Sequence, residues 1–174
     1  MSITEYAHEV VEFVRANEAW AVPIVFLLAF GESLAFISLL LPSTIILFGI
    51  AGLMGASGID FWRLWIAAGI GGTLGYGLSY WAGYYFRDSI TQIWPFSRHP
   101  ELLPRGEEFF KKYGAFAVFL GHFFGPVRAV IPVVAGMYQM PQYQFQIANV
   151  ASAFIWATTV LAPGIYGGRW LFGG

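Results

Sequence analysis

One long apolar stretch decides the fold: Ala19–Ile59, which reads AWAVPIVFLLAFGESLAFISLLLPSTIILFGIAGLMGASGI. Its 41 residues contain a single charged side chain, Glu32. A spanning helix needs about 20 apolar residues, so the stretch is too long for one helix and short for two with a turn. Pro42, Ser43 and Thr44 interrupt it, and a proline breaks a helix because it lacks the amide hydrogen. We therefore expect a re-entrant helical hairpin with its tip near Pro42 and both ends on one side of a membrane; two short tilted spans are the alternative.

Charges are scarce in two further segments. Leu64–Phe86 has none, and Tyr113–Gly168 has one formal charge, Arg128, together with His122. Charged residues make up 11% of the chain, against about 25% in an average soluble domain. This distribution predicts an integral membrane protein with several crossings. The net charge of −1 argues against nucleic-acid binding, and the chain has no cysteine and only three histidines, so we expect no metal and no cofactor.

The chain is predicted to be one membrane domain, 1–174, built from two similar halves. The first half covers about 1–88, the polar connecting segment 87–112 and the second half about 100–172. The triplet AGM at 135–137 resembles AGL at 51–53, and a phenylalanine follows the central glycine by nine residues in both. Each half then contains an amphipathic helix, a re-entrant helical hairpin and one transmembrane helix. One crossing per half makes the halves inverted repeats; chance matching of apolar residues is the alternative.

Local patterns assign the remaining elements. Residues 2–18 predict an amphipathic helix at the membrane interface, or a polar extension of the first membrane helix. Leu64–Phe86 predicts a conventional span with a packing stripe of small residues at four-residue intervals. These residues are Gly71, Gly75, Ser79 and Gly83. Segment 87–112 predicts a loop and a short surface helix, on the cytoplasmic side because it holds five of the nine basic residues. The seven tryptophans fall mostly toward segment ends and predict interfacial belts rather than a ligand cage.

The charges inside the apolar segments are the candidate functional groups. Arg128 lies between two predicted helix breaks, Gly125-Pro126 and Pro132. A charge at membrane depth costs at least about 2.5–3.5 kcal/mol, so Arg128 must face a partner or water. We expect Glu32, the only acid of the apolar segments, within direct or water-bridged reach. Arginine binds phosphate or carboxylate bidentately, which points to an anion or lipid-phosphate site; a structural Arg–Glu pair is the alternative.

Proton exchange is the expected role of Glu32, which would be neutral alone in hydrocarbon and ionised beside Arg128. His122 lies six residues before Arg128, and a break near Gly125-Pro126 would bring both onto one cavity. A histidine there assists ligand binding or simply makes a buried hydrogen bond. The chain has no nucleophile elbow, no H-E-x-x-H and no P-loop, so we expect no enzyme.

Four segments resemble the signature segments of the DedA family, the bacterial branch of proteins with a VTT (SNARE-associated) domain. They are Glu32–Phe36, Leu40–Thr44, Gly121–Arg128 and Pro132–Met137. The resemblance extends from about residue 23 to residue 168. It implies a small multi-pass protein of the bacterial inner membrane with two opposed re-entrant hairpins. It also implies lipid translocation, with undecaprenyl phosphate as the best-argued substrate, dependence on the proton-motive force, and roles in envelope integrity and in drug or pH tolerance.

The family's usual essential set is two acids in the first hairpin and two arginines in the second. Glu32 matches the first acid and Arg128 the second arginine. The chain departs elsewhere: Pro42-Ser43-Thr44 lacks the second acid, His122 replaces the first arginine, and Gly75-Tyr76 lacks the acid of the family's middle span. These departures bear on proton coupling and on the identity of the lipid.

The sequence thus predicts an all-α polytopic membrane protein that acts as a transporter or flippase for a phosphate-bearing lipid, of the undecaprenyl phosphate or phospholipid class. Arg128 and His122 would bind the headgroup, and Glu32 would couple protonation to release. The expected partners are the lipid bilayer and this lipid, with no nucleic acid and with homo-oligomerisation left open. The alternative is a non-transporting, membrane-organising protein in which Glu32 and Arg128 form a structural ion pair.

Overall fold

The computed structural model describes residues 12, 16–34, 43–92 and 96–172. Throughout these residues the regular structure is helical, which confirms the predicted all-α class. The helices in chain order are α2 (Glu18–Ser33), α3 (Ser43–Ala56), α4 (Phe61–Tyr85), α5 (Arg87–Ile90), α6 (Leu102–Tyr113), α7 (Ala115–Gly121), α8 (Gly125–Met137) and α9 (Gln142–Phe172). The hairpin tip expected at Pro42 and nearly all of the expected helix 2–18 lie outside the described residues.

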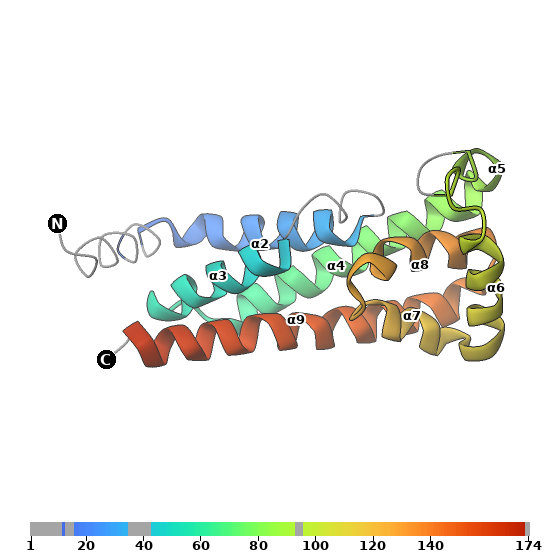
Figure 1. Cartoon of the computed structure of the whole chain (residues 1–174). Coiled ribbons are helices and arrows are strands. Elements are labelled where there is room, and N and C mark those ends of the chain that lie inside the picture. The colour runs from blue at the N-terminus through green and yellow to red at the C-terminus, as the bar shows by residue number, and fades with distance from the viewer. Residues whose placement is uncertain (1–11, 13–15, 35–42, 93–95, 173–174) are drawn as a thin grey trace.

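Two long antiparallel helices, α4 and α9, run along an elongated bundle (Figure 1). Helix α2 starts at the end of the bundle where α9 finishes, and α3 returns toward that end. Helix α7 starts at the opposite end, beside α6, and α8 returns to it. Helix α4 packs against α2, α8 and α9, whereas α9 packs against α3, α7 and α4. The inner ends of the short helices α2, α3, α7 and α8 therefore meet near the middle of the bundle (Figure 1).

Small residues allow the close approach of α4 to its neighbours. A Cβ added at Gly71 would lie 2.5 Å from the carbonyl oxygen of Phe26 in α2, and Gly75 lies equally close to the backbone of α2. Farther along α4, Gly83 contacts the backbone of Val133 in α8. The predicted packing stripe is therefore confirmed, and it serves two partner helices.

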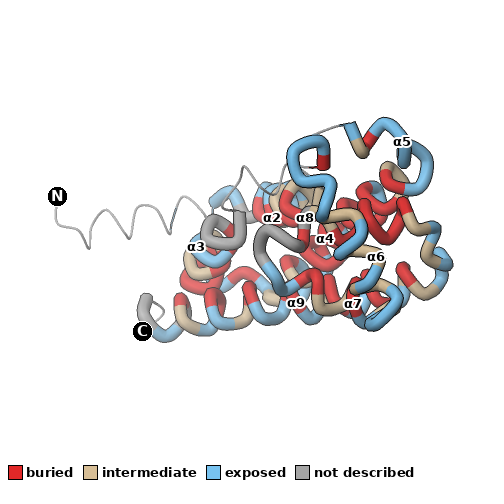
Figure 2. The backbone as a smooth tube through the Cα atoms, turned by 45° about the vertical axis from the view of Figure 1, so that its right-hand side comes forward, coloured by how far each residue is buried: buried red, intermediate tan, exposed pale blue. Residues whose placement is uncertain are grey.

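Figure 2 shows buried residues along the interior of the bundle, and many of the exposed residues outside are large and apolar. On α4 the exposed side chains Ile66, Ile70, Leu74 and Leu78 repeat every four residues and form one face. Among the described helices, only α9 has a segment long and apolar enough to cross a membrane by length and composition, Gln142–Gly168. Helix α4 has the extent of the span predicted at 64–86, but glycine, tyrosine and tryptophan lower its hydropathy. The surface helix predicted within 87–112 is α6, which has no buried residue.

Prolines 126 and 132 have different effects on α8. Pro126 lies in the first turn of the helix, where a missing amide hydrogen costs little. The break expected there falls between the end of α7 at Gly121 and the start of α8 at Gly125. The break predicted at Pro132 is wrong, because α8 continues through it to Met137. Pro132 only removes the amide that would bond the carbonyl of Arg128 four residues earlier, and a buried position inside a bundle tolerates that loss. Ser43 and Thr44, predicted as part of the first break, begin α3.

Candidate functional site

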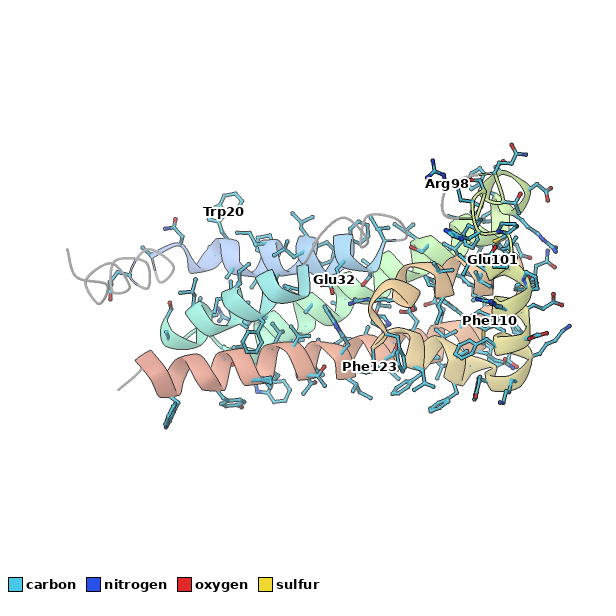
Figure 3. The ribbon with its side chains drawn as sticks, viewed as in Figure 1. Trp20, Glu32, Arg98, Glu101, Phe110 and Phe123 are labelled. Carbon is cyan, nitrogen blue, oxygen red and sulfur yellow. The ribbon has the colours of Figure 1, made fainter. Side chains whose placement is uncertain are left out.

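A buried ion pair joins the ends of two short helices near the middle of the bundle. Glu32 and Ser33 form the end of α2, and Arg128 lies in the first turns of α8. Figure 3 places Glu32 midway along the bundle. Each charge lies at the unfavourable end of its own helix, since a helix C-terminus disfavours an anion and an N-terminus disfavours a cation. Neither charge is therefore stabilised by its own helix, and each depends on the other.

The guanidinium of Arg128 is held on two sides. Its Nη1 donates to Oε1 of Glu32 over 2.8 Å, and its Nη2 donates to Oγ of Ser33 over 2.9 Å. The ring of Trp156 from α9 covers the guanidinium, 4.2 Å from the ring centroid, as in a cation–π contact. Arg128 is 4% exposed and Glu32 5%. The expected proximity of the two charges is confirmed, and it is direct.

His122 lies beside this pair, just after α7. Its ring is 4.3 Å from the ring of Tyr76 and 6.1 Å from that of Trp156, so His122 and Arg128 share Trp156 as a neighbour. Its Nδ1 is 3.0 Å from Oγ of Ser152. The structure thus brings together Glu32, Arg128 and His122, and it also provides the buried hydrogen bond that was the structural alternative for His122.

Four members of this site were not expected from the sequence: Ser33, Tyr76, Ser152 and Trp156. Trp156 was expected in an interfacial belt, which is wrong at this position: the side chain is 5% exposed and lies against the buried cation. Trp156 lies 12 residues before the end of segment 113–168 and near the middle of α9, and this distance from a segment end was the signal that could have identified it. Ser33 directly follows Glu32, but adjacency alone does not assign a serine to a site.

Two departures from the family pattern are in contact with each other. His122 stands where the resemblance expects an arginine, and Tyr76 stands where it expects an acid. Their rings lie against each other in the interior, tilted by 41°, so a pair of expected charges is replaced by a pair of uncharged or titratable rings. The side chain at the third departure, Thr44, is outside the described side chains.

The side chains of this site are chemically suited to anion recognition and to proton exchange. Arg128 provides a planar fork of donors, and Glu32 and Ser33 now occupy the positions that an anion's oxygens would take. In the described part of the chain, no three His, Cys, Asp or Glu side chains are grouped to hold a metal ion. The site residues that could act are therefore a base, a fixed cation and hydrogen-bonding groups.

Comparisons with known proteins identify the family. The family model described as the VTT domain matches residues 41–166. The inner membrane protein YabI of Escherichia coli K12 is 32% identical over 157 residues, which cover 90% of this chain and 61% of YabI. Undecaprenyl phosphate transporter A of Bacillus subtilis 168 is 33% identical over 137 residues, 75% of this chain and 68% of that protein. Protein DedA of Escherichia coli K12 is 26% identical over 162 residues, 90% of this chain and 73% of DedA.

No solved structure matches the chain significantly. The chain spans 61% of the length of YabI. The VTT-domain match covers more than half of the chain and includes Arg128, whereas Glu32 lies nine residues before its first residue. The sequence segments that resemble the DedA family, the matched domain and the named membrane-protein relatives agree. The chain belongs to the VTT-domain family of bacterial membrane proteins, the DedA family.

Proposed function

We propose that this protein is a multi-pass transporter that moves a phosphate-bearing lipid, undecaprenyl phosphate or a phospholipid, across the bacterial inner membrane. The observation that carries the proposal is the buried fork of Arg128, whose two amino groups are held by a carboxylate and a hydroxyl. Buried arginine forks of this kind suit phosphate, because a phosphate presents two oxygens at the same spacing. The name of the relative undecaprenyl phosphate transporter A supports the lipid class.

The binding step is an exchange at Arg128. In the present arrangement Glu32 occupies the fork, so the site is closed to an anion. Protonation of Glu32 removes one charge of the pair and weakens it, which frees the fork for a phosphate. Loss of the proton restores the carboxylate, which then competes with the phosphate and favours release. Because the cycle makes and breaks no covalent bond other than to the proton, the role is that of a transporter and not of an enzyme.

Two inverted halves would place this exchange at the centre of the membrane. The helix pairing supports the arrangement: α4 packs against its own α2 and against α8 of the other half, and α9 packs against its own α7 and against α3. In the proposed topology α2–α3 and α7–α8 are re-entrant hairpins that enter from opposite sides, while α4 and α9 cross. The N-terminus of α8 would add partial positive charge beside the headgroup, which His122 assists in binding.

A membrane-organising role is the second candidate. The observation that favours it is that the Arg128 guanidinium is buried and already contacted by Glu32, Ser33 and Trp156. In that case the pair only fastens α2 to α8, and no lipid passes.

The substitution Arg128→Lys separates the two candidates. Lysine keeps the charge, and so can still pair with Glu32, but it loses the planar fork. For a transporter, translocation of a fluorescent lipid phosphate in liposomes should fall at least about tenfold, the equivalent of 1.4 kcal/mol and one charge-assisted hydrogen bond. Melting temperature should change little in the same preparations. The matched control is Arg105→Lys, an exposed position on α6. Unchanged translocation in Arg128→Lys would reject the transport mechanism.

A further inference from the structure

Five buried polar atoms lack a hydrogen-bond partner among the described residues. They are Oγ1 of Thr73, the hydroxyl of Tyr76, Nε2 of His122, Nε of Arg128 and Oδ1 of Asn149. Leaving such an atom unsatisfied costs about 1–3 kcal/mol, and native proteins commonly satisfy it with ordered water. Several of these atoms in one interior region therefore indicate internal water.

The residues that carry these atoms are connected by direct contacts. Arg128 and His122 both face Trp156, and His122 also lies against Tyr76. From His122 the contacts continue along α9 through Ser152, whose hydroxyl donates to the carbonyl of Asn149 over 3.1 Å. The Asn149 amide donates to the carbonyl of Thr73 over 2.9 Å and to Oε1 of Gln146 over 3.2 Å. The five atoms thus belong to one continuous polar region between α4, α7, α8 and α9.

A polar stripe on α9 extends this region toward the α6 end of the bundle. Gln142, Gln146, Asn149 and Ser152 are spaced by four, three and three residues, which places them on one face of the helix. Their burial increases along the stripe: Gln142 is exposed, Gln146 half-buried, and Asn149 and Ser152 fully buried. Six residues of helix separate Gln146 from Ser152, a rise of about 9 Å. The stripe therefore leads from the surface to the ion pair.

The last step, from the stripe to the ion pair, passes Gly72. A serine hydroxyl has one hydrogen, so when Ser152 donates to Asn149, Nδ1 of His122 is a donor and its Nε2 an acceptor. A Cβ added at Gly72 would lie 3.9 Å from this Nε2 and 3.5 Å from Oγ of Ser33, the hydroxyl bound to Arg128. Because glycine has no side chain, room is left between these two polar groups.

We propose that these residues hold a file of internal water molecules, the internal water path, through which protons pass between the α6 end and Glu32. The inference rests on the proposed proton-exchanging role of Glu32. In each step a water accepts one proton and releases another to the next water, and the last proton binds the Glu32 carboxylate. Among the residues that the structure describes, the titratable or charged groups that face the path are Glu32 from α2, Tyr76 from α4, His122 after α7 and Arg128 from α8. Helix α9 contributes only uncharged side chains there.

Hydroxyl-radical footprinting by X-ray exposure tests for the water, because it labels side chains that contact bound water. Tyr76 and Tyr80 are a matched pair one turn apart on α4: both are buried and both stack on Phe145. They differ in that the Tyr80 hydroxyl donates to the carbonyl of Met140 over 2.6 Å. We expect several-fold faster labelling of Tyr76 and His122 than of Tyr80. Equal, slow labelling of all three would overturn the internal water path.

Two substitutions test the passage of protons. Gly72→Ala fills the room between His122 and Ser33 at ordinary contact distances, and Asn149→Leu removes the polar group at the centre of the stripe. Both should abolish proton-driven lipid movement and proton uptake into liposomes that contain a pH-sensitive dye. The control is Gly52→Ala, whose Cβ would meet only the carbonyl oxygen of Gly164 at 3.7 Å.

Unchanged proton uptake in both folded variants would overturn the proton role even if Tyr76 is labelled. If the wild-type protein moves no lipid at all, the proposed transport function is refuted. The footprinting of Tyr76 then still tests whether internal water is present. Asn149→Leu and the footprinting keep the test decisive if Gly72→Ala does not fold.

Discussion

Removing the Glu32–Arg128 charges singly and together should give a strongly non-additive change in the free energy of unfolding. The variants are Glu32→Gln, Arg128→Gln and the double variant. Each single change removes the Glu32–Arg128 ion pair from a remaining charge that is 5% exposed or less. Breaking a buried pair in this way costs about 3–5 kcal/mol. Additive effects would then destabilise the double variant by roughly 6–10 kcal/mol.

The double variant should instead lose only about 1–2 kcal/mol, because two neutral amides replace two charges and keep a hydrogen bond. The helix ends contribute in the same direction. Glu32 lies at the C-terminus of α2 and Arg128 near the N-terminus of α8, so removing each charge relieves about 0.3–1 kcal/mol of unfavourable dipole interaction. The expected coupling energy of the pair is therefore at least about 4 kcal/mol.

The measurement is reversible unfolding in mixed detergent micelles, followed by circular dichroism. The matched control is the pair Glu107–Lys111 on α6, which has the same 2.8 Å separation but is exposed. The corresponding double-mutant cycle of Glu107 and Lys111 should give a coupling energy of about 0.5 kcal/mol or less. The mutual dependence of the two charges is refuted if the effects of Glu32→Gln and Arg128→Gln on the free energy of unfolding are additive. It is also refuted if either single variant lowers that free energy by less than about 1 kcal/mol.

Two further predictions concern packing and the connecting segment. A Cβ at Gly136 would lie 2.7 Å from the backbone amide of Tyr84, so Gly136→Ala should lower the free energy of unfolding by about 1–3 kcal/mol. The control is Gly49→Ala, whose Cβ meets nothing within 4 Å and which should leave the free energy of unfolding unchanged or raise it. Equal effects of the two substitutions would contradict the close packing of α4 and α8. The backbone amide of Glu101 and the ring of His99 hold the pKa of the Glu101 carboxyl below its ordinary value, so the stabilisation that this carboxylate provides is lost as the pH falls through its folded-state pKa. His99→Ala should raise that pKa in an NMR titration, and an unchanged titration would show that the ring has no part in it.

The sequence by itself determined the class of protein and the central interaction. Long segments without charge have no stable place in water, so composition alone indicated a helical membrane protein. The pairing of Glu32 with Arg128 was also predictable, although 96 residues separate them. The apolar segments contain no other formal charges, and unpaired burial of either charge is too costly. The stripe of Gly71, Gly75 and Gly83 likewise predicted a close contact with another helix.

Only the tertiary structure decided which uncharged residues complete the site. Periodicity shows which face of a helix is apolar, but not which helix lies against that face. Trp156 is a neighbour of Arg128 only because the tertiary fold brings its ring on α9 over the guanidinium, and Tyr76 contacts His122 only because α4 passes the end of α7. Pro132 was expected to end a helix because local chemistry favours a break. Inside the bundle it continues one, since packing on several sides holds the helix together and offsets the loss of a single hydrogen bond.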